Sequence, residues 1–154
     1  MKIRLYGILL LMLFLCTSIL YSCSKDGNPS SPEKTPEQIL TGVSWKIDEI
    51  RSQIGNIPYS YKRGSPNHEL DNEYITFRND HTGTYVAPNG TQYQISTWNF
   101  VDSPKTKLQY TIAFSTPLVV NWEIMAMKPD NIKYGEYHVS KDGPSLAYAT
   151  RIPR

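Results

Sequence analysis

The sequence predicts an all-β domain, namely an eight-stranded antiparallel up-and-down barrel that follows a short helical turn. From Val43 onward, apolar and polar residues alternate with the period of two that is typical of half-buried strands. Clusters of turn-forming residues, such as Pro88-Asn89-Gly90 and Asp102-Ser103-Pro104-Lys105, separate the alternating segments. All but one of the connections are short enough for hairpins. This favours an up-and-down meander over the long crossings of a β-sandwich, which is the alternative fold.

The first 22 residues have the pattern of a secretion signal. Lys2 and Arg4 precede the apolar run Leu5–Leu15, as the charged and hydrophobic regions of a signal peptide do. An uncleaved membrane anchor is the alternative, because residues 5–24 carry no charge and about 20 apolar residues suffice to span a bilayer.

The end of this segment, Leu20-Tyr21-Ser22-Cys23, resembles the lipobox of bacterial lipoproteins. The resemblance implies that Cys23 becomes the first residue of the mature chain and carries a diacylglycerol thioether and an N-acyl chain such as palmitate. Several acyl chains anchor a protein stably to a membrane, whereas a single chain does not. A serine directly after the cysteine, as at Ser24, resembles the sorting signal of outer-membrane lipoproteins. The sequence does not show whether the protein would lie on the periplasmic or the cell-surface face of that membrane. Cleavage to a soluble protein is a further alternative.

Charge and cysteine content restrict the mature chain. The 16 Lys and Arg against 14 Asp and Glu become 14 against 14 once Lys2 and Arg4 are set aside. A neutral mature chain is not expected to bind nucleic acid. Cys16 would leave with the signal and Cys23 would be lipidated, so the folded part would have no thiol for a disulfide or a nucleophile.

The chain is expected to divide into the signal at residues 1–22, the lipidated Cys and a flexible tether at 23–36, and the barrel domain at 37–154. Residues 24–36 contain three prolines and three serines and no apolar side chain, so they cannot pack. Thr35-Pro36-Glu37-Gln38 has the residues of a capping box with proline at the first helical position, and Gly42 is expected to end this helical turn.

Eight strands are predicted, near residues 43–51, 72–79, 83–88, 91–101, 106–115, 118–127, 131–139 and 145–152. In three of them the apolar residues change face midway, after Ile47, after Ile95 and at Gly135, which indicates a bulge or bend. The one long connection is Ser52–Asp71, a predicted loop of 20 residues. Loops of that length are often functional or else mobile.

Bulky side chains are predicted to fill the barrel, which favours a packed interior or a shallow mouth over a deep pocket. The predicted inward set is Trp45, Ile47, Ile75, Phe77, Tyr85, Tyr93, Ile95, Trp98, Phe100, Leu108, Tyr110, Ile112, Phe114, Val120, Trp122, Ile124, Ile132, Tyr134, Leu146 and Tyr148.

Three stretches resemble the small lipocalin-like lipoproteins of Gram-negative bacteria. These are Leu40-Thr41-Gly42-Val43-Ser44-Trp45, the segment Ile75–Tyr85 and Trp98-Asn99-Phe100. The resemblance covers about residues 37–152. It implies an eight-stranded calycin-type barrel that is closed at one end by the helical turn and by Trp45 acting as a plug. It implies no particular ligand.

Aromatic side chains near the predicted barrel mouth are the candidate ligand-binding residues: Tyr59, Tyr61, Tyr93, Trp98 and Tyr110. The loop over residues 52–71 adds Lys62, Arg63 and His68 to two of these tyrosines, a mixture of stacking surface and positive charge. It is expected either to gate a ligand or to be a solvated loop.

No combination of residues points to catalysis, a metal or a cofactor. His68, His81 and His138 lie far apart, without the spacing of metal ligands. The adjacent carboxylates Asp48-Glu49 lie on a predicted strand, where neighbouring side chains point to opposite faces, so they cannot share one proton. An enzyme is therefore not expected.

The leading hypothesis is a membrane-anchored envelope lipoprotein whose barrel binds a small apolar or aromatic molecule. The alternative is a structural or interaction lipoprotein with a filled core, which docks onto another envelope component through residues 52–71 or 118–127. The volume of the interior separates the two, because binding needs a cavity of a few hundred cubic ångströms.

Overall fold

A computed structural model describes residues 33–154 apart from 55–56 and 141–142. The predicted signal at 1–22, Cys23 and most of the tether lie outside the described residues. Residues 34–154 form one compact unit.

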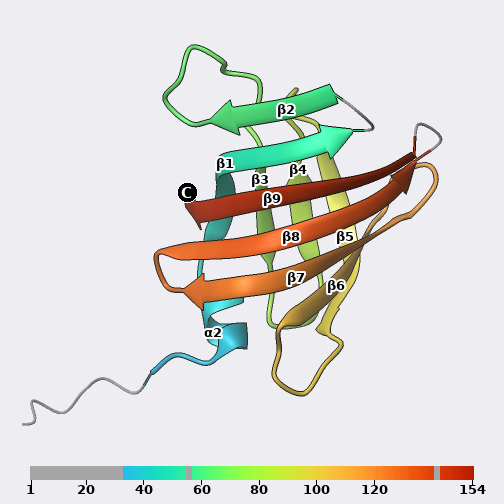
Figure 1. Cartoon of the computed structure of the whole chain (residues 1–154). Coiled ribbons are helices and arrows are strands. Elements are labelled where there is room, and N and C mark those ends of the chain that lie inside the picture. The colour runs from blue at the N-terminus through green and yellow to red at the C-terminus, as the bar shows by residue number, and fades with distance from the viewer. Residues whose placement is uncertain (1–32, 55–56, 141–142) are drawn as a thin grey trace, which may run out of the picture. The chain divides into compact units, whose positions relative to one another are not determined.

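The fold class is confirmed: the unit is an antiparallel β-barrel of eight strands with one additional strand. The strands of the barrel are β1 (Ser44–Ile54), β3 (Tyr74–Phe77), β4 (Gly83–Val86), β5 (Gln92–Phe100), β6 (Lys107–Ile112), β7 (Leu118–Lys128), β8 (Asn131–Ser140) and β9 (Gly143–Pro153). Each pairs with the next along the chain, and β9 pairs with β1 to close the barrel. The additional strand is β2 (Ile57–Lys62), at the edge of the sheet beside β1 (Figure 1).

The helical turn α2 (Pro36–Leu40) has the predicted capping box. The Thr35 hydroxyl accepts from the Gln38 backbone N–H at 3.3 Å, and the Gln38 side chain accepts from the Thr35 backbone N–H at 2.9 Å. Gly42 follows the end of the helix, where a Cβ would lie only 2.8 Å from the Gln38 carbonyl oxygen. Ile39 and Leu40 are buried in the core, so the turn covers one end of the barrel, the closed end (Figure 1).

The prediction of a loop at Ser52–Asp71 is wrong, because most of this segment belongs to a β-hairpin. Strand β1 continues to Ile54, and β2 pairs with it from Ile54↔Ile57 to Glu49↔Lys62. The irregular connection is left with residues 63–73. Strand β2 contains Pro58, which an edge strand tolerates because the N–H groups on its outer side pair with no neighbouring strand.

Two of the three predicted changes of face are confirmed as register shifts, between Ile47 and Glu49 and between Ile95 and Thr97. The change at Gly135 is wrong: the β8–β9 register is regular through that residue. The irregularity lies instead in the facing strand β7, after Ile124.

Strand β9 has the opposite face inward from the one predicted. Leu146 and Tyr148 are 42% and 50% exposed, whereas Ala149 and Arg151 are buried. The prediction placed the larger apolar residues inside the barrel. In the structure the ring of Tyr148 lies on the outer face, over Gly135. The inward side chain near the end of β9 is Arg151, which pairs with Glu73. The other members of the predicted inward set are buried or pack against the core.

Aromatic rings fill the closed half of the barrel. Phe77 makes edge contacts with Trp98, Tyr110 and Trp122, at centroid distances of 5.8, 5.4 and 5.8 Å. Trp45 is fully buried, and its indole N–H donates to the Leu40 carbonyl at 2.9 Å, which ties the first strand to the end of α2. Because side chains fill the closed half, any interior cavity must lie at the opposite end of the barrel, which we call the mouth.

Candidate ligand-binding site

The mouth half of the barrel contains a cavity of about 230 Å³. Its wall is apolar and is made by Ile47, Ile50, Leu70, Ile112, Phe114, Leu118 and Val120. Its polar residues are Glu73, Tyr85, Tyr110, Tyr134, Glu136 and Arg151. We call these six residues the polar floor. The wall residues come from β1, β6, β7, the turn between β6 and β7, and the connection 63–73, so the cavity needs segments that are far apart in the sequence.

Arg151 and Glu73 form the central ion pair of the polar floor. Arg151 donates from Nη2 to Glu73 Oε1 at 2.7 Å and from Nη1 to Glu73 Oε2 at 3.1 Å. The same guanidinium donates to the Trp45 carbonyl and to the Tyr134 hydroxyl, each at 3.0 Å. A buried arginine is stable only when its charge and its N–H groups are matched in this way.

The Trp122 ring packs against two residues of the polar floor, Tyr134 and Arg151. Trp122 and Tyr134 stack with centroids 3.9 Å apart, and the Arg151 guanidinium lies 5.5 Å from the Trp122 ring centroid. The Trp122 indole N–H donates to Glu136 Oε2 at 2.6 Å. Trp122 of the aromatic core thus contacts both Arg151 and Glu136 and helps to orient the two side chains.

Burial and neighbouring charges shift the pKa values of four residues of the polar floor. Burial alone would lower the pKa of the Arg151 guanidinium, but the Glu73 carboxylate and Tyr134 hold that pKa well above its ordinary value. Burial raises the pKa of Tyr85 to about 12 and also raises the pKa values of Tyr110 and Tyr134 above their ordinary value. The three phenols are therefore neutral over the physiological range, and Arg151 is charged.

The connection 63–73 is fastened to the barrel by Arg63. Its Nε donates to the Ile47 carbonyl at 2.7 Å, at the point where β1 no longer pairs with β3. Its Nη1 and Nη2 donate to the carbonyls of Asp71 and Leu70 at 3.1 and 3.3 Å. Asp71 also accepts from Tyr61 at 2.6 Å and from His68 at 2.7 Å. These contacts hold Leu70 in the cavity wall.

The five predicted ligand residues are not brought together. Tyr110 lines the cavity, and Tyr93 packs nearby against Phe114 at a centroid distance of 4.5 Å. Tyr59 and Tyr61 lie on β2, and their hydroxyls donate to Glu69 and Asp71 of the connection. Trp98 is part of the aromatic core towards the closed end, where its indole N–H donates to the Arg78 carbonyl and its ring stacks on His81.

Sequence reasoning missed the charged floor. Glu73 and Arg151 are 78 positions apart, and each looked like a surface residue of its strand. The one available signal was the small-residue face of Ala147 and Ala149, which runs into Arg151. Only the β8–β9 register, with Ile132 opposite Arg151, shows that this face points inward.

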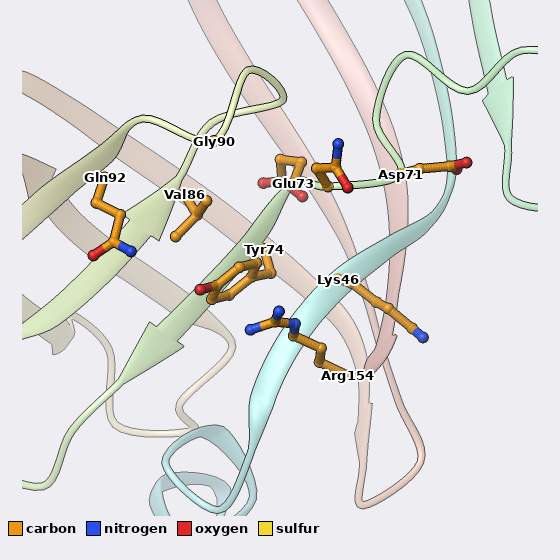
Figure 2. A pocket seen from close by; sticks show the side chains of 9 residues that line it. Lys46, Asp71, Glu73, Tyr74, Val86, Gly90, Gln92 and Arg154 are labelled. Carbon is orange, nitrogen blue, oxygen red and sulfur yellow. The ribbon is translucent and has the colours of Figure 1, made fainter.

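A second hollow of about 310 Å³ lies beside β3 and β4 and is more polar. Figure 2 shows the side chains around it: Arg154 lies against Tyr74, with its guanidinium 3.8 Å from the ring centroid, and Lys46 points away. Glu73 borders both hollows. Because its cations are stacked or directed outward, this hollow presents fewer convergent groups than the cavity.

No protein-family model matches the chain, and no curated protein resembles it significantly in sequence. Within residues 33–54, 57–140 and 143–154, no three His, Cys, Asp or Glu side chains are grouped so as to hold a metal ion. In the same ranges no helix is long and apolar enough to cross a bilayer.

Proposed function

We propose that the chain is an envelope lipoprotein whose lipocalin-like barrel binds a small, mainly apolar molecule in the mouth cavity. The observation that carries the proposal is the cavity itself, with an apolar wall and a few convergent polar groups at its floor. This combination is typical of small-molecule sites, where apolar contact supplies affinity and a few polar groups fix orientation.

The volume limits the size of the ligand. Pockets for drug-sized ligands have volumes of about 300–1,000 Å³, and an apolar cavity of about 150 Å³ in another protein binds benzene. A cavity of about 230 Å³ therefore suits a molecule with one ring and a short substituent, or a branched chain of similar bulk.

Membrane attachment through lipidated Cys23 is the second part of the proposal. The tether of residues 24–36 would span up to roughly 40 Å at about 3 Å per residue. A barrel on such a tether can take up a ligand some distance from the bilayer. The expected membrane is the outer one.

Native mass spectrometry of the full chain in detergent micelles tests the binding function. An additional mass that is lost on denaturation supports it. Leu118→Trp, which places a large ring in the cavity wall, should abolish that mass. The neighbouring Val119→Trp should keep it, because Val119 lies outside the lining and is 50% exposed. A bare polypeptide mass for the unaltered chain would count against the proposal.

A docking function is a second candidate, and one observation favours it. Tyr137, Leu146 and Tyr148 are large, exposed side chains on the outer face of β8 and β9, and Tyr137 lies directly opposite Leu146. Exposed apolar patches often mark interaction sites. Cross-linking in intact cells, compared between the unaltered chain and Tyr148→Ser, tests this candidate: the product should depend on Tyr148.

A further inference from the structure

The Tyr110 hydroxyl is a buried group without a hydrogen-bond partner in the part of the chain that the structure describes. Tyr110 is 4% exposed, and no described residue makes a hydrogen bond with its hydroxyl. Within the described residues, every side-chain nitrogen or oxygen that is fully shielded from solvent has a partner. The Tyr110 hydroxyl is therefore open to the cavity that the residue lines.

Two more phenols present donors at the same place. Tyr85 also has no hydrogen bond to a described residue. Tyr134 accepts from Arg151 Nε, and no described residue accepts from its own O–H. Tyr85, Tyr110 and Tyr134 line the same cavity as Glu73, Glu136 and Arg151.

The charges of the floor are already engaged. Both Glu73 oxygens accept from Arg151, and four of the five Arg151 N–H groups have acceptors. Glu136 accepts from Trp122. A carboxylate ligand would lose its hydration and face Glu73 and Glu136, and an ammonium ligand would face Arg151. The Arg151 charge that a carboxylate would need is already matched by Glu73, and both Glu73 and Glu136 already accept N–H hydrogen bonds from the protein.

Resting on the proposed binding function, we infer that the cavity selects uncharged ligands whose polar end is a hydrogen-bond acceptor, of the class of an aryl ketone, aldehyde or amide. The acceptor oxygen meets the Tyr110 hydroxyl, with Tyr85 and Tyr134 as neighbouring donors, while the ring or chain packs against Ile112 and Val120.

Four probes of similar size separate the possibilities: acetophenone, toluene, benzoate and benzylamine. The full chain in micelles, with labelled Ile, Leu and Val methyl groups, is titrated with each probe and followed by NMR. Shifts at Ile112 and Val120 report the cavity, and shifts at the exposed Val119 and Ile57 report non-specific partitioning. Acetophenone should bind about five-fold more tightly than toluene, as expected for one neutral hydrogen bond, and the two ions more weakly still.

Two matched variants test the donor. Tyr110→Phe should reduce the affinity for acetophenone to about that for toluene and leave toluene binding unchanged, which also shows that the variant is folded. Tyr137→Phe, which alters a hydroxyl on the outer face, should change neither.

Equal binding of acetophenone and toluene, or tightest binding of an ion, would overturn the inference and leave the binding function in place. The absence of shifts at Ile112 and Val120 with all four probes would count against the binding function as well.

Discussion

The Arg151 guanidinium lies against the Glu73 carboxylate in a two-point ion pair of 2.7 and 3.1 Å inside the barrel. The two side chains are 6% and 4% exposed. Residues 78 positions apart in the chain thus join the last strand of the barrel to the start of β3.

Removing one partner of this pair should destabilise the fold strongly. Glu73→Gln leaves a buried, uncompensated guanidinium, and we expect a loss of about 3–5 kcal/mol in the free energy of unfolding. Denaturant unfolding measures it. The control is Glu49→Gln, which removes an exposed partner of Arg51 and should cost less than about 1 kcal/mol. A double variant, Glu73→Leu with Arg151→Met, should recover much of the loss, since no buried charge remains.

Trp45 should be essential for the closed end. Trp45→Ala removes a fully buried indole and its hydrogen bond to Leu40, and should cost about 3–5 kcal/mol. Thermal unfolding is the measurement. Trp45→Phe keeps most of the ring volume and should lose less. An unchanged melting temperature for Trp45→Ala would contradict a role in closing the barrel.

Two glycines in strands should respond differently to alanine. A Cβ at Gly83 would lie 2.4 Å from the Thr76 carbonyl oxygen in the neighbouring strand, so Gly83→Ala forces β3 and β4 apart. We expect a loss of about 1–3 kcal/mol, as for other overpacked sites. At Gly135 the nearest atom is the Tyr148 ring at 3.6 Å, an ordinary contact. Gly135→Ala should therefore be tolerated in the same unfolding assay.

Acid should loosen the connection 63–73. Hydrogen bonds from Tyr61 and His68 hold the pKa of Asp71 below its ordinary value of 3.8. A carboxyl whose pKa is lowered by folding contributes stability that is complete above the unfolded value and is lost as the pH falls through the folded one. Unfolding free energies measured from pH 7 down to below 3.8 should fall less steeply for Asp71→Asn than for the unaltered chain.

Membrane attachment should depend on Cys23. Cys23→Ser removes the thiol that the acyl chains require and should move the protein from the membrane fraction to the soluble fraction. Fractionation followed by mass determination is the measurement. Retention of Cys23→Ser in membranes, with residues 1–22 still attached, would instead support an uncleaved anchor.

The sequence predicted the barrel because its strands alternate cleanly and its turns are short. The bulge after Ile47 was visible because Ile50 lies on the other parity. Alternation alone could not show which face of β9 points inward. Leu146 and Tyr148 have larger apolar side chains than Ala147 and Ala149, but the pairing with β8 turns the two alanines towards the interior. Strand β2 was missed because Pro58 interrupts a short pattern.

The candidate site was predicted only in part, for a related reason. Tyr110 lies at an inward position of a regular strand, so periodicity sufficed to place it. The polar floor depends on the pairing of Arg151 with Glu73, which local pattern does not encode. The aromatic character of Trp98 predicts a place at the mouth, but its position along β5 puts it in the closed half.

The pairing of β1 with β9 has a consequence for how the domain folds. It joins Trp45 to Pro153, among the longest sequence separations that the domain allows, and folding slows as contacts become less local. Until β9 has been synthesised, β1 and β8 each have an open edge of unpaired backbone groups, the kind of edge along which chains associate. One strand of 11 residues removes both edges at once. The loss of these two open edges is therefore a single late step, which occurs when the C-terminal strand becomes available.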